Sequence, residues 1–338
     1  MQAVELSAPS LDAFRRVTLP QPEPGPGEAL VAMRAASLNF VDLAVATGRY
    51  PVPRFPLIPV ADGAGEVAAV GPGVTEFVVG QRVIAHSKPL WVGGPARAEI
   101  SAATRGVVLP GSLVEYVALP ASALVPTPTH LTDEAAATLP IAATTAWRGL
   151  RTAGVRAGSV VTLIGTGGVS VMALQLAKAV GATVIITSSS DEKLERAKAL
   201  GADFTINYRR TPAWDEAVLE MTGGVGADLI VETGGTQTFG RSINAAALGA
   251  TVFVIGFVTG TTAEADLFAI MRKELNVQGN TTGSVADLRD AARAVAASKM
   301  MPVIDRTFGI DETPQAYAYL AQGGQHFGKI AITCGYGY

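Results

Sequence analysis

The pattern of apolar and polar residues changes character near residue 126. Before that point, short apolar runs are separated by glycine and proline, and the clearest are EALVAMRAASLNF, GEVAAVGPGV, GQRVIAH and GSLVEYVALP. Such spacing predicts the short strands of a compact, mostly antiparallel β domain. The stretch 88–110 is glycine-rich and weakly periodic, and we expect it to form a long loop.

After residue 126, strand patterns alternate with helix patterns. SVVTLIG and TVIITS have the apolar density of buried strands, and each precedes a helix pattern: GGVSVMALQLAKAVG, and DEKLERAKALG ending at Gly201. Four more apolar strand patterns follow in DFTINY, ADLIVET, ATVFVIGF and LNVQG. Six strands in this order predict an α/β fold with a six-stranded, doubly wound Rossmann sheet.

The end of the chain carries one more strand pattern, GKIAIT, which we expect to return to the first domain. The sequence therefore predicts a β-rich domain formed by residues 1–125 and 283–338. The Rossmann domain is expected to cover residues 126–282.

A glycine-rich turn, Gly165-Thr166-Gly167-Gly168-Val169-Ser170, joins the first Rossmann strand to its helix. At this position the backbone can approach a pyrophosphate at the start of a helix. Ser170 replaces the third glycine of the G-x-G-x-x-G pattern and is still small enough for close packing of the helix on the sheet. Glycines also mark ordinary turns, but the flanking strand and helix predict nucleotide binding here.

The end of the second Rossmann strand indicates which nicotinamide cofactor binds. An NAD site usually has an acid there that holds the ribose hydroxyls, whereas Ile186–Ser190 has none. These hydroxyls and Lys193 favour the 2′-phosphate of NADP(H). The alternative is that Ser189 and Glu192 form a helix capping box while Lys193 is solvated. A small loop shift would bring Asp191 near the ribose.

Composition and charge narrow the range of partners. The 338 residues are 49% hydrophobic and 16% charged, with a formal net charge of −3. These values exclude a broad basic field for nucleic acid or anionic lipid, and Arg209-Arg210 is typical of solvated surface. The chain shows no secretory signal or membrane-spanning apolar run, and its single cysteine, Cys334, fits a reducing compartment. We expect a cytoplasmic protein that acts on a small molecule.

Longer motifs resemble the medium-chain dehydrogenase/reductase superfamily along essentially the whole chain. GEVAAVGPGVTEFVVGQRV is similar to a motif of its N-terminal GroES-like domain. Leu139-Pro140 to Ala146-Trp147, GTGGVSVMALQLAKAVGA and SSSDEKLERAKALGAD resemble its cofactor-binding half. The resemblance implies a GroES-like catalytic domain, interrupted by the Rossmann domain and completed by the tail, with a nicotinamide cofactor in the interdomain cleft.

Zinc alcohol dehydrogenases of this superfamily surround the catalytic metal with a cysteine, a histidine, and a cysteine or acid. The corresponding positions here are Asn39, Ala61 and Ile141, and residues 88–110 lack the four cysteines of a structural zinc site. The three histidines share no spacing typical of a metal site: His86, His130 and His326. We therefore expect a protein without zinc.

Asn39-Phe40-Val41-Asp42 and Gly48-Arg49-Tyr50 resemble the quinone oxidoreductase branch instead. This resemblance implies that Asn39 and Tyr50 offer hydrogen bonds to the substrate and that Thr145 approaches the nicotinamide. By residue type alone, Asn39 also fits a turn after a strand, and Tyr50 fits packing beside Pro51. The expected cofactor contacts are Gly165, Thr166, Gly167, Gly168, Val169, Ser188, Lys193, Tyr208, Gly256 and Phe257.

Two acidic residues near these positions, Asp42 and Asp62, are expected to be structural. Without zinc, reduction of a ketone needs another group to stabilise the alkoxide. Hydride addition to an activated C=C bond or a quinone is less demanding, because the substrate's own carbonyl accepts the developing charge. We therefore expect an NADPH-dependent enone or quinone reductase.

Two alternatives stay open. One is a zinc-independent, NADP-linked alcohol dehydrogenase or carbonyl reductase, and the other is a nicotinamide-binding protein without catalysis. The resemblance also implies a homodimer that pairs the last Rossmann strands, ATVFVIGF and LNVQG, across a two-fold axis.

Overall fold

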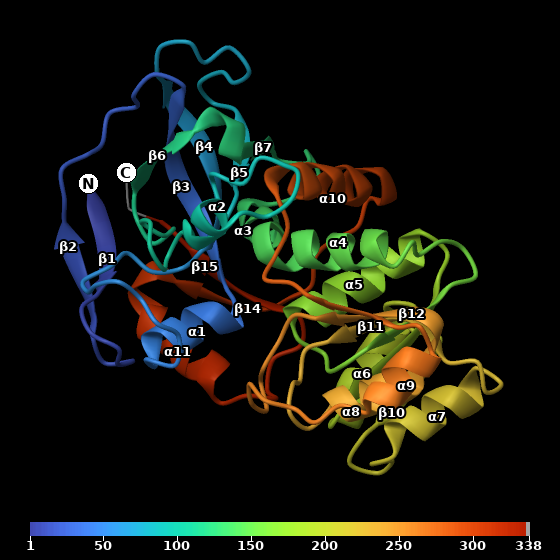
Figure 1. Cartoon of the computed structure of the whole chain (residues 1–338). Coiled ribbons are helices and arrows are strands. Elements are labelled where there is room, and N and C mark those ends of the chain that lie inside the picture. Colours follow the sequence, from blue (N-terminus) through green and yellow to red (C-terminus); the bar gives the residue numbers. More distant parts are fainter. Residues whose placement is uncertain (336–338) are drawn as a thin grey trace. The chain divides into compact units, whose positions relative to one another are not determined.

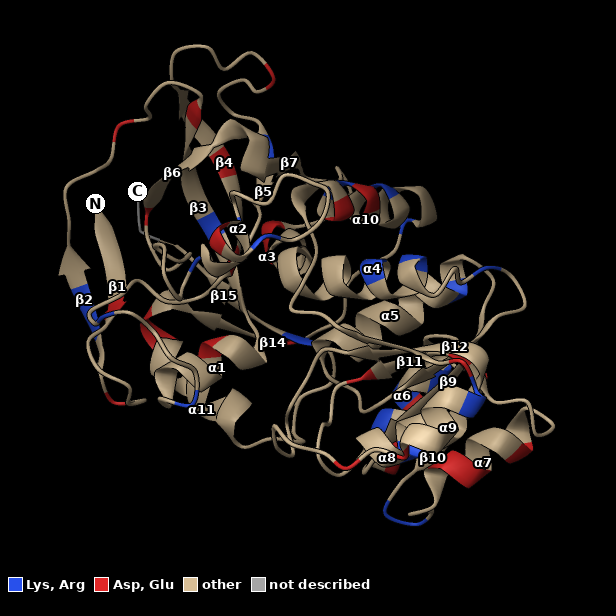
Figure 2. Ribbon diagram, in the orientation of Figure 1, with Lys and Arg blue, Asp and Glu red and all other residues tan. Residues whose placement is uncertain are grey.

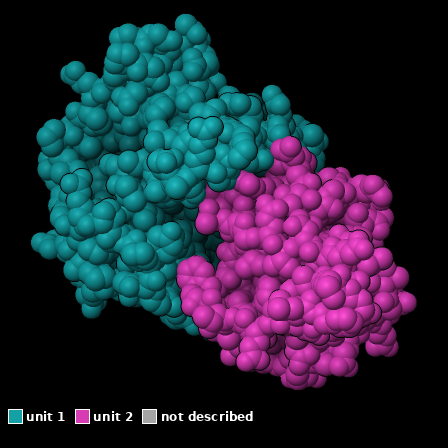
Figure 3. Space-filling view, viewed as in Figure 1, with its two compact units in different colours: residues 1–144, 284–338 teal, residues 145–283 magenta. Residues whose placement is uncertain are grey.

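The computed structural model describes residues 1–335, and their contacts form two units. Unit 1 holds Met1–Thr144 and the segment that begins at Ser284, and unit 2 holds Thr145–Gly283; Figure 3 colours the two differently. Residues 126–144, which we expected in the Rossmann domain, belong to unit 1 by their contacts.

Unit 1 is built on a seven-stranded sheet with the order β14-β15-β3-β4-β5-β7, and β6 also pairs with β3 (Figure 1). Only β14 and β15 run parallel, so the predicted, mostly antiparallel β domain is confirmed. The sequence patterns did not predict the separate antiparallel pair of β1 and β2. The strands are β1 Gln2–Leu6, β2 Phe14–Thr18, β3 Glu28–Leu38, β4 Asp62–Val70, β5 Arg82–Ala85, β6 Tyr116–Pro120, β7 Leu124–Pro126, β14 Ile304–Gly309 and β15 Lys329–Thr333.

The C-terminal strand β15 lies beside β3, as the GKIAIT pattern predicted, with Ile330 opposite Leu38. This pairing places Lys329 next to the carboxyl end of β3 although the two segments are far apart in the chain. The helices of unit 1 are α1 Phe40–Ala46, α2 Ala98–Ala102, α3 Asp133–Ala137, α10 Val285–Ser298 and α11 Thr313–Ala321. Short helical turns occur at Ala121–Ala123, Leu139–Ala143 and Ile310–Glu312.

Unit 2 is a six-stranded parallel sheet with the order β10-β9-β8-β11-β12-β13, so the doubly wound Rossmann sheet is confirmed. Its strands are β8 Val160–Leu163, β9 Thr183–Ser188, β10 Phe204–Asn207, β11 Ala227–Glu232, β12 Ala246–Val254 and β13 Asn276–Gly279. The central strands are apolar because helices cover both faces of such a sheet, and Ile185, Ile230 and Val252 meet in one core cluster.

The helices of unit 2 connect these strands. They are α4 Thr144–Thr152 (which begins one residue earlier, in unit 1), α5 Gly168–Ala179, α6 Asp191–Ala199, α7 Trp214–Met221, α8 Phe239–Ala245 and α9 Leu267–Arg272. Helices α5 and α6 pack against β8, β9 and β10, and α8 packs against β11 and β12. Because the six strands are parallel, their carboxyl ends lie at one edge of the sheet, and the glycine-rich turn lies at this edge.

The expected loop at residues 88–110 contains only the short helix α2 and is fastened at several points. The Lys88 ammonium donates to the Ser101 carbonyl at 2.6 Å and to the Ser101 hydroxyl at 2.9 Å. The carbonyls of Trp91 and Val92 accept from the backbone N–H groups of Val285 and Ala286 at the start of α10. The loop is therefore a fixed part of unit 1.

Candidate active site

The turn between β8 and α5 has open space at its glycines. Gly165 adopts a φ of +74°, which favours glycine, and a Cβ added at Gly165 or Gly167 would meet no atom within 4 Å. No side chain caps α5 at Gly167, so protein side chains do not compete for the N–H groups of the first turn. These features fit the pyrophosphate of a dinucleotide at the start of a 12-residue helix.

Three hydroxyl groups hold this turn in place. Ser170 Oγ and Thr233 Oγ1 both donate to the carbonyl of Ile164, at 2.8 and 2.7 Å. Thr187 Oγ1 accepts from the N–H of Gly165 at 3.0 Å. Ser170 therefore does more than fit a small space, because its hydroxyl fastens the helix to the end of β8.

The end of β9 differs in detail from the sequence prediction. The residue that caps α6 is Ser190, whose Oγ accepts from the N–H of Lys193, so the predicted capping box of Ser189 and Glu192 is wrong. The cap moved by one residue because the strand runs to Ser188, leaving Ser190 as the last extended residue. Lys193 is only 8% exposed, so the alternative of a solvated lysine is also wrong.

Other predicted cofactor contacts of unit 2 lie at the same edge of the sheet. Ser188 is buried, and its carbonyl accepts from the N–H of Tyr208, whose side chain is exposed. Gly256 follows β12, and a Cβ there would lie 2.2 Å from the Thr233 carbonyl, so only glycine fits. Phe257 comes next and is half-buried.

Glu232, at the carboxyl end of β11, shapes the neighbouring loop and was missed by sequence reasoning. Its Oε1 accepts from the N–H groups of Gly234 and Gly235 at 2.7 and 3.0 Å and from the Thr238 hydroxyl at 2.6 Å. Its Oε2 accepts from the Ser242 hydroxyl. The buried carboxylate is satisfied by these four donors and is therefore structural.

A second group of candidate residues lies in unit 1, around Asn39. This residue follows β3 and is the N-cap of α1. Its Nδ2 donates to Asp62 Oδ2 at 2.9 Å, and its Oδ1 accepts from Lys329 Nζ at 2.6 Å. Lys329 Nζ also donates to the Leu38 carbonyl at 2.8 Å and lies 3.6 Å from Asp62 Oδ2. Both ends of the Asn39 amide are therefore bound within the protein.

Burial dominates the electrostatics of this cluster. It raises the pKa of the Asp62 carboxyl to about 7, although the Lys329 ammonium and the Asn39 amide act to lower it. Burial also lowers the pKa of Lys329, against the attraction of Asp62 and Asp42. Asp42 fixes the backbone as expected, because its carboxylate accepts from the N–H groups of Asn39 and Ala61 at 2.7 and 2.9 Å.

Two further buried side chains of unit 1 carry shifted pKa values, and sequence reasoning assigned them no role in the site. Arg105 Nη2 donates to the Gly111 carbonyl at 3.1 Å, and burial lowers its pKa to about 10 while Asp62 acts to raise it. His86 Nδ1 accepts from the N–H of Lys88 at 2.9 Å, and burial lowers its pKa to about 4, so the ring is neutral. Only the fold brings Arg105 close enough to Asp62 for their charges to interact.

The residues at the expected metal positions do not fit zinc. Asn39 Oδ1 is bound to the Lys329 ammonium, while Ala61 and Ile141 have apolar side chains. Within residues 1–335, no group of three His, Cys, Asp or Glu side chains lies close enough together to hold a metal ion. A tetrahedral zinc site needs four ligands of such types at fixed geometry.

The other two predicted catalytic residues are Tyr50, in unit 1, and Thr145, in unit 2. Tyr50 is 36% exposed and follows the carboxyl end of α1, whereas Asn39 begins that helix. The chain turns back after α1, because the N–H of Tyr50 donates to the Ala44 carbonyl at 3.0 Å and the Arg49 guanidinium lies 5.3 Å from the centroid of the Phe40 ring. Thr145 is the first residue of unit 2, and its buried hydroxyl has no hydrogen-bond partner among the described residues.

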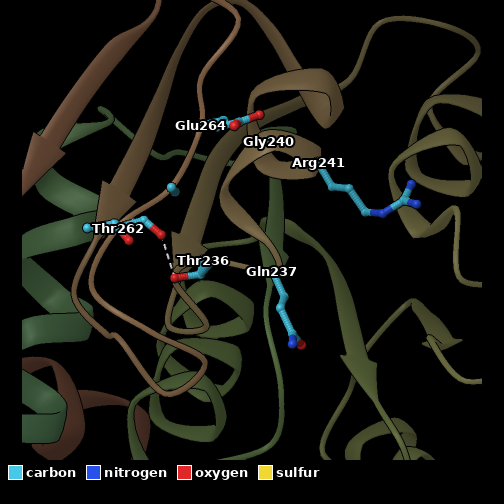
Figure 4. A pocket seen from close by; sticks show the side chains of 7 residues that line it. Thr236, Gln237, Gly240, Arg241, Thr262 and Glu264 are labelled. Atoms are coloured by element: carbon cyan, nitrogen blue, oxygen red, sulfur yellow. Dashed lines mark hydrogen bonds between the residues drawn. The ribbon is translucent and has the colours of Figure 1, made fainter.

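A pocket of about 690 Å³ opens on unit 2 between the start of α8 and the loop after β12. Its charged and amide side chains do not converge, since Arg241, Gln237 and Glu264 point in different directions in Figure 4. The Arg241 guanidinium is already paired with Asp215. We assign no ligand to this pocket.

Comparison with known proteins places this arrangement in a family. Residues 25–129 match the alcohol dehydrogenase GroES-like domain, and residues 168–297 match the zinc-binding dehydrogenase domain. The chain belongs to the medium-chain dehydrogenase/reductase superfamily. It is therefore an oxidoreductase of a nicotinamide-dependent family.

Individual relatives cover almost the whole chain. A zinc-type alcohol dehydrogenase-like protein of Schizosaccharomyces pombe is 42% identical over 91% of each chain. A quinone oxidoreductase of Pseudomonas aeruginosa is 32% identical over 88% of this chain and 89% of its own. The crystal structure of a protein from Sinorhizobium meliloti 1021, described as a putative alcohol dehydrogenase, has a TM-score of 0.91 and 40% identity over 98% of each chain. Within residues 1–335, no helix is long and apolar enough to cross a membrane.

Proposed function

We propose that this protein is a zinc-independent reductase that transfers hydride from NADPH to an activated C=C bond or a quinone. The observation that carries the proposal is the cluster around Asn39, where an amide and an ammonium stand at the expected metal site. Without a metal to polarise a ketone, the substrate must stabilise its own developing negative charge. Enones and quinones do so through conjugation. The name of the Pseudomonas relative agrees with this substrate class.

In unit 2, Gly165, Gly167 and the start of α5 would hold the pyrophosphate, with Ser188 and Tyr208 nearer the adenosine end. The bound cofactor would supply the hydride. Thr145 has a buried hydroxyl that is free to donate, which fits a contact with the carboxamide of the nicotinamide. Tyr50 remains our candidate for a contact with the substrate, whereas Asn39, whose amide is bound to Asp62 and Lys329, would act by holding these two groups in place.

The proton that completes the reduction needs a source in the protein or solvent. In place of the structural role we expected from the sequence, we propose the Asp62 carboxyl as this source, because a group with a pKa of about 7 gives and takes a proton readily near neutral pH. Its Oδ1 has no hydrogen-bond partner among the described residues, while its Oδ2 is held by Asn39 and the N–H of Ile141. Lys329 and Asn39 would keep this carboxyl in position.

The test is the oxidation of NADPH or NADH by chelator-treated protein, measured as the loss of absorbance of the reduced nicotinamide. Quinones, enones and simple ketones serve as separate acceptors. We expect chelator-insensitive oxidation of NADPH with enones or quinones and little with ketones. Activity confined to ketones or alcohols would favour a zinc-independent alcohol dehydrogenase or carbonyl reductase. Cofactor binding without turnover on any acceptor would favour the non-catalytic alternative.

A homodimer in the cytoplasm completes the proposal. The strand β13 forms one edge of the unit 2 sheet, and the neighbouring helix α9 exposes an apolar face. Leu267, Phe268 and Met271 are 75%, 64% and 67% exposed, which is unusual for three large apolar side chains on one short helix. A second copy that pairs at β13 would cover both features.

A further inference from the structure

Arg105 is a large side chain with no exposed surface, in the loop between α2 and β6. Its Nη2 donates to the Gly111 carbonyl at 3.1 Å, but its Nε and Nη1 have no hydrogen-bond partner within residues 1–335. Burial lowers the pKa of Arg105 only to about 10, so the guanidinium stays charged near neutral pH. Because a buried charge is costly without an opposite charge, Arg105 favours a carboxylate in its surroundings.

The fold places Arg105 beside the segment that carries Asp62. The next residue, Gly106, has a φ of +71°, and a Cβ added there would lie 2.8 Å from the Val60 carbonyl carbon and 2.9 Å from the Ala61 nitrogen. Only glycine therefore fits this contact. The backbone that follows Arg105 thus touches the two residues before Asp62, and the Asp62 carboxyl acts to raise the pKa of the arginine.

The two oxygens of the Asp62 carboxyl have different surroundings. Oδ2 accepts from Asn39 Nδ2 and from the Ile141 N–H, and it lies 3.6 Å from Lys329 Nζ. Oδ1 is buried and has no hydrogen-bond partner among the described residues. The Lys329 ammonium already donates to two other oxygens, so it compensates a carboxylate at Asp62 only in part. The Arg105 guanidinium, with unpartnered donors, is a second cation for this charge.

We propose that Arg105 is a positioning residue that stabilises the carboxylate left when Asp62 gives up its proton, an inference that rests on the proposed function. In that reaction, addition of hydride from NADPH to one carbon of the C=C bond leaves an enolate. The O–H bond of Asp62 then breaks, its proton bonds to the α-carbon of the enolate, and the electron pair of the O–H bond stays on the carboxylate. Water restores the proton. A permanent cation beside the acid makes this donation easier.

Other charged groups near Asp62 are few, so the effect of Arg105 can be measured. Most of the ribbon of unit 1 is tan in Figure 2, which marks positions without charge. His86 follows β5, the neighbour of β4, and is neutral because burial lowers its pKa to about 4. Helix α3 also packs against β4, but its two acids, Asp133 and Glu134, are bound to other side chains. The charged groups that act on Asp62 are Lys329 on β15, Asp42 on α1 and Arg105.

Infrared titration of Asp62 tests the inference without relying on turnover. The C=O stretch of the protonated carboxyl is isolated by comparing each protein with the same protein carrying Asp62→Asn. We expect a midpoint at about pH 7 for the wild type. Arg105→Met should raise the midpoint by about one pH unit, a tenfold tighter hold on the proton, because the carboxylate loses a neighbouring cation. Arg105→Lys keeps the charge and should raise it less.

A second neutral variant and a matched control accompany this comparison. Arg105→Gln keeps an amide that can donate to the Gly111 carbonyl, which favours folding, and circular dichroism checks every variant. Lys88→Met is the control, because it removes another buried cation of the same loop, whose ammonium is bound to Ser101. It should leave the midpoint of Asp62 unchanged.

The reductase assay gives a second measurement. The proton donor must be protonated, so the pH above which kcat/KM falls should rise together with the infrared midpoint in Arg105→Met and Arg105→Gln. A merely structural role would lower kcat/KM at every pH and leave this pH in place.

Two sets of outcomes separate the inference from the proposed function. An unchanged midpoint in both neutral variants of Arg105, or an equal shift in Lys88→Met, would overturn the inference and leave the proposed function standing. A midpoint that shifts only with Arg105, in a protein that reduces none of the acceptors, would reject the proposed function and keep the effect of Arg105 on Asp62.

Discussion

The buried charge of Lys329 in unit 1 is stabilised by only a few partner groups. Lys329 Nζ is held by the Leu38 carbonyl, by Asn39 Oδ1 and by the Asp62 carboxylate, and its side chain is 3% exposed. Removing one partner of a buried ion pair leaves the other charge without compensation. Each residue of this cluster is therefore expected to affect stability more than a surface charge does.

Replacement of Lys329 by methionine tests this expectation. We predict that Lys329→Met lowers the free energy of unfolding by about 3–5 kcal/mol, because Asp62 and Asn39 lose their cation. Urea unfolding followed by circular dichroism measures the change. The control is Lys198→Met, which removes an exposed ammonium paired with Glu195 and should change stability by less than about 0.5 kcal/mol. Equal effects of the two substitutions would contradict the prediction.

The pH dependence of stability tests the environment of Asp62. Burial raises its pKa from 3.8 to about 7, the neighbouring Lys329 acts to lower it, and the Asp42 carboxylate acts to raise it further. Between these two values the folded protein keeps a proton that the unfolded chain has lost, so this group makes stability fall as pH rises. We predict that the stability of wild type relative to Asp62→Asn decreases from pH 4 to pH 7. A difference that stays constant over this range would show that the pKa is not raised.

At the scale of elements, the β8–α5 connection combines local sequence signals with contacts from other strands. The periodic apolar pattern and the glycines predict the strand, turn and helix without any knowledge of the rest of the chain. The hydroxyls of Thr187 and Thr233, on the neighbouring strand β9 and just after β11, then fix the turn. The element is thus locally encoded, but its exact geometry depends on its neighbours in the sheet.

The open space at Gly167 gives a prediction for this element. Gly167→Ala should change the free energy of unfolding by less than about 1 kcal/mol, since the residue is an extended N-cap and its new methyl group meets no atom. The methyl group would occupy the space we assign to the pyrophosphate. Fluorescence titration should show a loss of NADPH affinity of about tenfold or more, equivalent to at least one lost hydrogen bond.

A matched control is Gly93→Ala, which adds the same group in a loop of unit 1, where the Cβ makes an ordinary 3.7 Å contact with Ala286. It should leave both stability and cofactor affinity nearly unchanged. If Gly167→Ala bound NADPH as well as the wild type does, the turn would not be the pyrophosphate site.

At the scale of the whole molecule, an open sheet edge and an exposed apolar helix occur together on unit 2. Unpaired backbone groups on an edge strand favour pairing with another chain, and β13 carries Val277 with 40% of its surface exposed. Leu267, Phe268 and Met271 add apolar area next to it. Such a surface is the expected interface of the proposed homodimer.

Charge placed on this surface should separate the copies. We predict that Phe268→Lys shifts the sedimenting species from a dimer to the 34.7 kDa monomer, because a buried, unpaired ammonium is costly at an interface. Val225→Lys is the control, since Val225 is 68% exposed in the loop after α7, away from the edge. A wild-type protein that sediments as a monomer, or a Phe268→Lys dimer of unchanged affinity, would reject this interface.

The sequence by itself determined the kinds of element and the residue types at the three positions where we expected a zinc enzyme to hold its metal. Strand and helix patterns, the glycine turn and the six-strand order are local signals, since hydrophobic periodicity and backbone preferences act over a few residues. The residue types at the three positions that correspond to zinc ligands, Asn39, Ala61 and Ile141, follow from the sequence without any structure. The sequence alone could indicate the choice between NADPH and NADH only in part, because the exposure of Lys193 depends on how α6 packs.

Only the tertiary structure decided which side chains meet. Lys329 reaches Asn39 across 290 residues because the register of β15 against β3 places them together. Arg210 meets Asp191 because β10 lies beside β9. These contacts depend on strand register and loop path, which are set by the packing of the whole unit, so no local pattern in the sequence encodes them.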